Sequence, residues 1–267
     1  MCSSDLLRRS GGDALGAIRA DLLAASCTRE VARAQAVRVS AERAGRPDLA
    51  AEAGLILARE AIAQGKPEAA RAAEIAVRAA VAHGGVPLQL AALDALASAE
   101  LQAGQPALAR HVLGQALTLA HAHPEPRLRA RVEARLAQVA LTEGEARQAL
   151  GLASDAHGLS ADPDAQLRCL AVTGRALLAL GRPDEARLAL AHALGQARAA
   201  RRVAWQAELA YELANVHTHS QEPDAALACF DEAWSCALAA GPASLAVRAR
   251  RGMAWSLRQR GDVDAAA

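Results

Sequence analysis

Small and apolar residues recur along the chain in blocks that polar turns separate. The turns return at intervals of 37 to 40 residues, at Gly65, Gly104, Gly144, Gly181, Gln221 and Gly261. A second set of breaks lies midway, at 45–48, 84–87, 123–126, 162–164 and 241–242. Together the two sets predict helices of about 15 to 18 residues, which is an ordinary helix length.

The residues at these breaks are those that end one helix and begin the next. Glycine ends a helix in the left-handed conformation, and proline opens the following helix, where its missing N–H costs nothing. Gly181-Arg182-Pro183-Asp184 has this order. Two further breaks have weaker signals, at 26–28 and at 200–202. The pattern therefore predicts two helices per period.

Within each period, the apolar residues form a repeated motif of a Leu-small pair followed by two alanines seven residues apart. Around Gly104 the motif is Leu96-Ala97, Ala109, Leu113 and Ala116, and around Gly181 it is Gly174, Ala186, Leu190 and Ala193. These residues resemble the tetratricopeptide repeat. The resemblance implies an all-α fold, a right-handed superhelical solenoid of antiparallel helix-turn-helix units. The period is closer to 40 than to the usual 34 residues, so HEAT-type repeats remain an alternative.

The repeats predict the domain organisation. Residues 7–267 form one array of six hairpins and a truncated seventh, because only a few residues follow Gly261. We expect the natural protein to continue beyond Ala267. Residues 1–6 read as the translation of a sequencing adapter, so we expect a non-native leader there.

Composition and charge narrow the function further. Thirty basic and 29 acidic residues leave a net charge of +1, which provides no global attraction for nucleic acid or an anionic membrane. Five scattered cysteines without a Cys-x-x-Cys pair argue against a disulfide framework and a zinc site. No apolar stretch is long enough to span a membrane, and no signal peptide is visible. We expect a cytoplasmic protein.

The sequence contains no catalytic signature. It lacks His-Glu-x-x-His, Gly-x-Ser-x-Gly and a phosphate loop, so we expect neither an enzyme nor a bound cofactor. His217 and His219 are two residues apart and point to different sides of a helix. Cys229 and Cys236 have the spacing of core residues. We therefore predict no metal site.

The resemblance assigns a partner-binding groove to the first helix of each repeat. Carrying over the groove positions of that family selects Arg131, Gln138, Arg168, Arg175, Glu208, Tyr211, Asn215, His219, Arg248, Arg251, Trp255 and Arg258. Arginine with tyrosine and tryptophan is typical of interface hot spots. Phe230 and Trp234 are expected in the core, whereas the positions of Tyr211 and Trp255 stay open.

These residues predict a protein-interaction or scaffold module that binds a peptide or protein, acidic or extended, in its concave groove. The alternative is the N-terminal sensory region of a larger bacterial signalling protein, either a diguanylate cyclase or a LuxR-type transcription regulator. Self-association through the uncapped C-terminal end is a further possibility.

Overall fold

The computed structural model describes residues 14–28, 30–240 and 243–262. These residues form thirteen α-helices and no strand. The helices are α2 (Ala14–Thr28), α3 (Val31–Arg43), α4 (Pro47–Ala63), α5 (Ala69–His83), α6 (Val86–Gln102), α7 (Pro106–His121), α8 (Pro126–Thr142), α9 (Ala146–Leu159), α10 (Pro163–Ala179), α11 (Pro183–Ala199), α12 (Val203–His219), α13 (Pro223–Ala240) and α14 (Ala243–Arg260).

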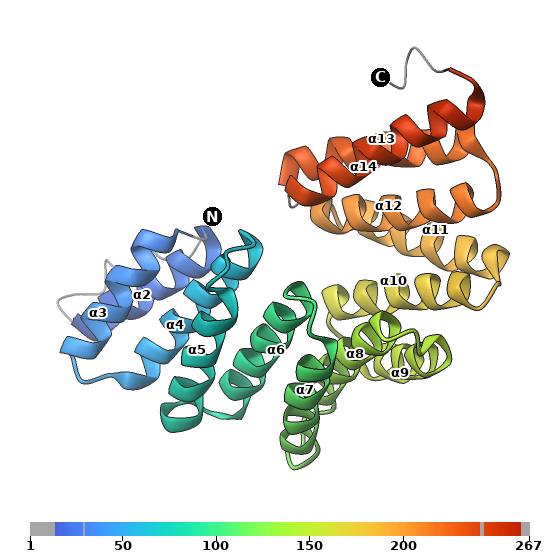
Figure 1. The fold of residues 1–267 in the computed structure, drawn as a ribbon. Helices are drawn as coiled ribbons and strands as arrows, with labels where there is room; N and C mark the ends of the chain where they lie inside the picture. The colour runs from blue at the N-terminus through green and yellow to red at the C-terminus, as the bar shows by residue number, and fades with distance from the viewer. Residues whose placement is uncertain (1–13, 29, 241–242, 263–267) are drawn as a thin grey trace. The chain divides into compact units, whose positions relative to one another are not determined.

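Consecutive helices such as α4 and α5, α6 and α7, and α12 and α13 pack as antiparallel hairpins, and Figure 1 shows the last of these pairs. The helices begin and end at the breaks that the sequence predicts, including the weak one at 200–202. The predicted all-α fold of helix-turn-helix repeats is confirmed. The predicted leader, residues 1–6, lies outside the described residues. We call α2, α4, α6, α8, α10, α12 and α14 the first helices, and the others the second helices.

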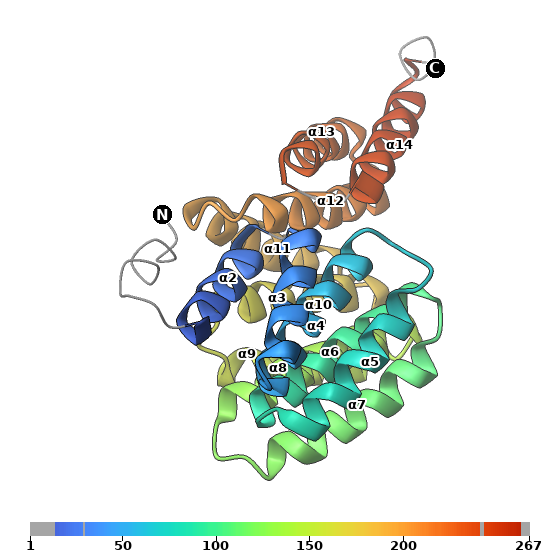
Figure 2. The same ribbon diagram turned by 90° about the vertical axis from the view of Figure 1, so that its left-hand side faces the viewer.

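The chain divides into two compact units, residues 1–128 and 129–267. Within each unit, the backbones of consecutive first helices approach one another: α2 contacts α4, and α10 contacts α12. In the described part of the chain, no such contact joins α3 to α5 or α11 to α13. In Figures 1 and 2, α5, α6 and α7 lie side by side in the first unit. The first helices are therefore the closely spaced layer of each unit.

A shared hydrogen-bond pattern ends many of the helices. At the end of α3, the Gly45 amide donates to the Glu42 carbonyl, and the Arg46 amide donates to the Ala41 carbonyl. This is the Schellman motif, which needs a residue with positive φ at the position of Gly45. The same pair of bonds recurs around Gly65, Gly104, Gly144, Gly181, Arg201, Gln221 and Gly261.

At two of these positions, a residue other than glycine adopts the left-handed backbone conformation. Arg201 has a φ of 52° and Gln221 a φ of 61°. A non-glycine residue there costs roughly 1–2 kcal/mol, which glycine avoids at an entropic cost of about 0.5–1 kcal/mol.

We therefore expect Arg201→Gly and Gln221→Gly each to raise the free energy of unfolding of the second unit by about 0.5–1 kcal/mol. Urea unfolding measures the change. Gly181→Ala makes the opposite change, from glycine to a residue with a Cβ, at a φ of 72°. It should lower the free energy of unfolding of the second unit. A loss of stability in both glycine variants would contradict this account of the caps.

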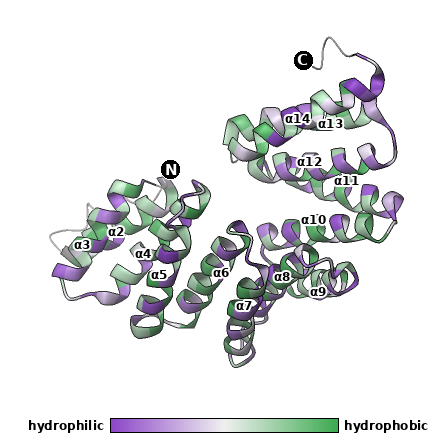
Figure 3. Ribbon diagram, in the orientation of Figure 1, coloured by the Kyte–Doolittle hydropathy of each residue, from purple (hydrophilic) through white to green (hydrophobic). Residues whose placement is uncertain are grey.

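Alanine dominates the helix–helix interfaces. In α5, α7 and α11 the buried positions follow a spacing of three or four residues, and α11 buries Ala186, Leu190, Ala193 and Ala197 completely. Apolar and polar positions alternate accordingly along the helices in Figure 3. Small side chains bring the helix axes close together, and the larger side chains interdigitate between them.

Two large side chains fill spaces that glycines leave. A Cβ on Gly174 of α10 would lie 2.4 Å from Cγ of Leu190 on α11. A Cβ on Gly252 of α14 would lie 2.6 Å from the ring of Phe230 on α13. Phe230 is only 3 % exposed, as the sequence predicts for a core position. Each pair fixes how far two neighbouring helices can separate.

None of the described helices combines the length and apolar composition that a bilayer span requires.

Candidate partner-binding surface of the first helices

A charged cleft of about 180 Å³ lies on the first helices of the second unit. Its walls come from α8, α10 and α12 alone. We call it the arginine cleft, and its lining residues are Arg135, Gln138, Arg168, Ala171, Val172, Arg175, Trp205, Glu208 and Glu212. Of the groove residues that the sequence predicts, the cleft brings together Gln138, Arg168, Arg175 and Glu208. They meet because each repeat contributes its first helix to the same layer.

The cleft has a basic side and an acidic side. The arginines lie on α8 and α10, whereas Glu208 and Glu212 lie on α12. Arg175 Nε is 3.6 Å from Glu212 Oε1, and Arg135 Nη1 donates to Gln138 Oε1 at 2.9 Å. Asn215 Nδ2 donates to Glu212 Oε2 at 3.3 Å. These contacts hold the polar groups in place before any partner arrives.

Glu208 lies among these charges but remains exposed to solvent. Desolvation by the surrounding walls raises its pKa, and Arg168 opposes the shift. Glu212 raises the pKa further, whereas Arg135 and Arg175 lower it. The cleft therefore places guanidinium groups of α8 and α10 opposite carboxyl groups of α12.

The remaining predicted groove residues are spread along α8, α12 and α14. Tyr211 is half-buried between α13 and α14: its ring centre is 5.6 Å from that of Phe230, and the Arg248 guanidinium lies 4.4 Å from its centre. Arg131 is half-buried on α8, and Arg251 and Arg258 are exposed on α14. Tyr211 thus joins neighbouring helices, and the Arg248 stack is a cation–π contact.

Trp255 and His219 line a second hollow of about 460 Å³, at the end of α12 and beside α14. Trp255 is 43 % exposed, so its indole is open to solvent. The other lining residues are Thr218, Gln221, Glu222, Pro223 and Gln259. The sequence analysis left the position of Trp255 open, and the structure places its ring on the surface of this hollow.

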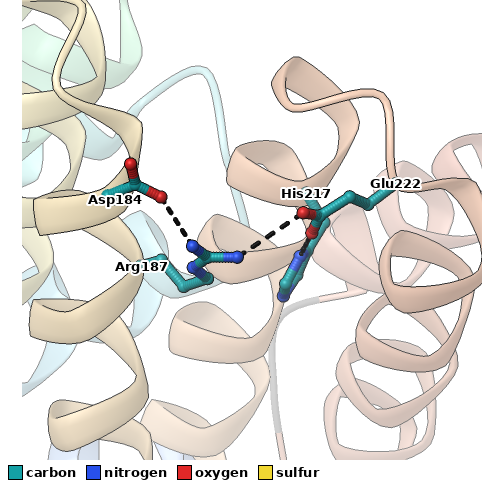
Figure 4. Close-up of polar contacts among 4 residues, drawn as sticks. All are labelled: Asp184, Arg187, His217 and Glu222. Carbon is teal, nitrogen blue, oxygen red and sulfur yellow. Dashed lines mark hydrogen bonds and ion pairs between the residues drawn. The ribbon is translucent and has the colours of Figure 1, made fainter.

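A polar network connects the α12–α13 turn to the preceding hairpin (Figure 4). Arg187 on α11 pairs with Asp184 at 2.6 Å and with Glu222 at 3.5 Å. The other carboxylate oxygen of Glu222 lies 2.6 Å from Nδ1 of His217. The hydrogen bond with His217 is the main cause that lowers the pKa of Glu222. The ionised carboxylate therefore stabilises the folded turn.

Because the Glu222 pKa is lowered on folding, its contribution is present above the unfolded value of about 4.5 and is lost as the pH falls through the folded value. We expect the urea midpoint of Glu222→Gln to change less than that of the natural chain between about pH 7 and pH 3. Asp155→Asn removes an exposed carboxylate on α9 and serves as the control. Equal acid sensitivity of Glu222→Gln and the natural chain would contradict the network's role.

Among the charged and aromatic lining residues of the arginine cleft, the sequence analysis missed Arg135, Trp205 and Glu212. A helical signal could have found two of them. Arg135 lies four residues after Arg131, and Glu212 lies four residues after Glu208, so each shares a face with a predicted residue. Each first helix exposes more residues on this surface than the groove positions carried over from the repeat family include.

The cysteine thiols of the second unit are in environments that disfavour the thiolate form. Burial raises the pKa of the Cys169 thiol to about 11, and it also raises the pKa of Cys229 and Cys236. Thiolates are the reactive and metal-binding form, so these groups are poorly suited to either role. In the described residues, no group of three or more His, Cys, Asp or Glu side chains could hold a metal ion.

Solved structures resemble this arrangement closely enough to decide the fold. The apo form of the quorum sensor NprR from B. thuringiensis matches 99% of this chain and 76% of its own, with a TM-score of 0.70 and 14% identity. The chain has a tetratricopeptide-like repeat fold. No family model matches the chain, and no curated protein matches it in sequence.

Two further structures share the fold of this repeat array. A Rap protein complexed with Competence and Sporulation Factor matches 93% of this chain and 73% of its own, with a TM-score of 0.68 and 15% identity. A signal transduction ATPase with numerous domains and a tetratricopeptide repeat sensor, from Pyrococcus horikoshii, has a TM-score of 0.65 and 15% identity. That match covers 96% of this chain and 42% of the other.

Proposed function

We propose that this chain is a protein-interaction module that binds a peptide or a segment of a partner protein along the first helices of its second unit. The observation that carries the proposal is the arginine cleft, to which three successive first helices contribute side chains. The module acts by binding alone, without catalysis and without a cofactor. A rigid surface of this kind lowers the ordering cost of docking.

The chemistry of the cleft favours a partner with carboxylates. Arg135, Arg168 and Arg175 offer forked donors that match carboxylate geometry. Trp205 adds planar apolar area, which is typical of binding hot spots. Glu208 and Glu212 restrict the acidic part of the partner to the side that faces α8 and α10, because like charges repel.

The structural likenesses support this proposal. One matched Rap protein was solved in complex with Competence and Sporulation Factor, and NprR is named a quorum sensor. Both share the fold with this chain at low sequence identity. That this chain also binds a peptide is therefore our proposal. The cysteines in the described residues form no disulfide, which agrees with a reducing cytoplasm, where we propose that the module works.

Selection from a random phage-displayed peptide library tests the proposal on the full chain. We expect the enriched peptides to contain acidic residues and to bind Arg175→Glu at least about tenfold more weakly than the natural chain, which corresponds to about 1.4 kcal/mol. Arg147→Glu makes the same charge change at an exposed position of the second helix α9, and it should bind normally. Equal binding by all three proteins would overturn the site.

A second candidate is the sensory region of a larger signalling protein, either a diguanylate cyclase or a LuxR-type regulator. The names "quorum sensor" and "tetratricopeptide repeat sensor" among the matched structures favour it. Reading the complete open reading frame from the source DNA tests this candidate, since it requires an output domain encoded with the array.

Self-association through the C-terminal end stays a prediction. Val247 and Trp255 of α14 are 70% and 43% exposed, so this helix offers apolar surface. Light scattering coupled to size exclusion measures the mass, and a monomer at all concentrations would contradict the prediction.

A further inference from the structure

A mostly apolar groove of about 350 Å³ lies in the first unit, between the second helices α3 and α5. The first helix α4 forms its floor. We call it the α3–α5 groove, and its lining residues are Arg38, Glu42, Pro47, Ala50, Ala51, Gly54, Ile75, Ala76, Ala79 and His83. It shares no residue with the arginine cleft, so an inference about it is independent of the proposed function.

We call the space between two successive second helices, above the first helix between them, a seam. In the next repeat, the first helix α6 has larger side chains at the corresponding positions. The helix α6 aligns with α4 at an offset of 39 residues, which places Leu93 at the position of Gly54 and Leu90 at that of Ala51. Leu93 and Leu90 are buried, with 6% and 4% exposure. On α4, a Cβ added at Gly54 would meet no atom within 4 Å. The small residues of α4 therefore leave a volume that the next repeat fills.

The corresponding seam in the second unit is bridged. There Arg198 on α11 donates to Glu232 on α13 at 2.9 Å, and Cys236 on α13 contacts Gln206 on α12. In the α3–α5 groove, the residues at these four positions are Glu42, Ile75, Ala79 and Ala50. They cannot form the same pairs. Ile75 instead remains 47% exposed.

One donor in the wall has no acceptor. Nε of Arg38 is buried and has no hydrogen-bond partner among the described residues. The nearest paired carboxylate oxygen, Oε1 of Glu42, is 3.9 Å away, which is beyond hydrogen-bond distance. The Arg38 side chain as a whole is 38% exposed and lines the groove, so its guanidinium charge is available to an anion there.

We propose that the α3–α5 groove binds a small aliphatic carboxylate. The chain of the ligand lies on Gly54 and the alanines of α4 and α5, where its burial from water drives binding. The carboxylate lies at the wall beside Arg38 and accepts from its guanidinium. An apolar body with few polar anchors is the common composition of small-molecule sites.

Isothermal titration of the full chain with decanoate tests the proposal. We expect Gly54→Leu to weaken decanoate binding by at least about tenfold, because the leucine occupies the groove as Leu93 does in the next repeat. Gly114→Leu is the matched control: Gly114 is an exposed helical glycine of α7 with nothing within 4 Å of an added Cβ. Equal binding to Gly54→Leu and the natural chain would overturn the site.

The carboxylate contact has its own test. Arg38→Gln should weaken decanoate binding several-fold and leave the binding of 1-decanol unchanged, because the alcohol lacks the charge. Glu42→Gln should strengthen decanoate binding, because it removes a competing negative charge. Opposite effects at neighbouring residues are not expected from a general loss of structure.

N-acetyl-leucyl-leucine carries the same carboxylate on a peptide and distinguishes the source of the ligand. Tighter binding of this peptide than of decanoate would overturn the proposal in favour of a peptide terminus. Failure of decanoate to bind the natural chain would also overturn it, and that result would leave the peptide selection at the arginine cleft unaffected.

Discussion

Replacing Leu190 with alanine is expected to lower the free energy of unfolding of the second unit by about 2–5 kcal/mol. Leu190 is completely buried on α11, and its side chain occupies the space above Gly174 on α10. The substitution removes the transfer free energy of the lost atoms and also leaves a cavity between two helices. Few single changes in this alanine-rich array remove as much buried volume.

Urea unfolding followed by tryptophan fluorescence measures this effect in the second unit. The three tryptophans, Trp205, Trp234 and Trp255, all lie in that unit. Leu188→Ala on the same helix is the matched control, because Leu188 is 72% exposed. It should change stability by no more than about 0.5 kcal/mol. A similar loss in both variants would contradict the assignment of Leu190 to the core.

Replacing Gly174 with alanine is expected to destabilise the same unit by about 1–2 kcal/mol. The added Cβ would lie 2.4 to 2.8 Å from three atoms of Leu190, which is fully buried and has little room to move. Such overpacking costs about 1–3 kcal/mol, whereas replacing a helical glycine with alanine returns at most about 1 kcal/mol. The clash therefore outweighs the gain in helix propensity.

Gly195→Ala separates the effect of the clash from the effect of helix propensity. Gly195 lies on α11, and nothing lies within 4 Å of an added Cβ. This substitution keeps the propensity gain without the clash, so it should stabilise the unit by about 0.5–1 kcal/mol. The same urea experiment measures both variants. Stabilisation by Gly174→Ala would show that α10 and α11 separate freely.

The double variant tests whether the two residues act through each other. The methyl group of Gly174→Ala points toward the cavity that Leu190→Ala leaves. We expect the double variant to lose less stability than the two single losses added together, by about 1 kcal/mol or more. Strict additivity would contradict direct packing between the two positions.

The repeat organisation could be predicted from the sequence because the helix ends are local features. Gly65, Gly104 and Gly144 adopt positive φ. Six of the described helices open with a proline at a predicted break: Pro47, Pro106, Pro126, Pro163, Pro183 and Pro223. The alanines seven residues apart lie in the helix interfaces, as expected. The weak break near Arg201 was harder to find, since an arginine there adopts the conformation that glycine usually adopts.

The candidate site could be predicted only in part. The groove positions carried over from the tetratricopeptide resemblance selected Arg168, Arg175 and Glu208, which line the arginine cleft. They did not show that Arg175 lies near Glu212, or that Arg248 stacks on Tyr211. These pairs join different helices, and their geometry depends on the distance and tilt between repeats. The predicted arginine-rich face is therefore partly balanced by carboxylates of α12.

By itself, the sequence determined where the helices begin and end, that alanines line the helix interfaces, and that two helices form each repeat. These properties depend on residues within a few positions of one another, through capping, helix propensity and helical spacing. The expectation that Trp234 lies in the core was not met, since this side chain is half-buried. Only the tertiary structure decided which seams between repeats are filled. Arg198 and Glu232 bridge one seam, whereas Gly54 leaves another open. Such contacts join residues of different helices, and they form only when the hairpins stack.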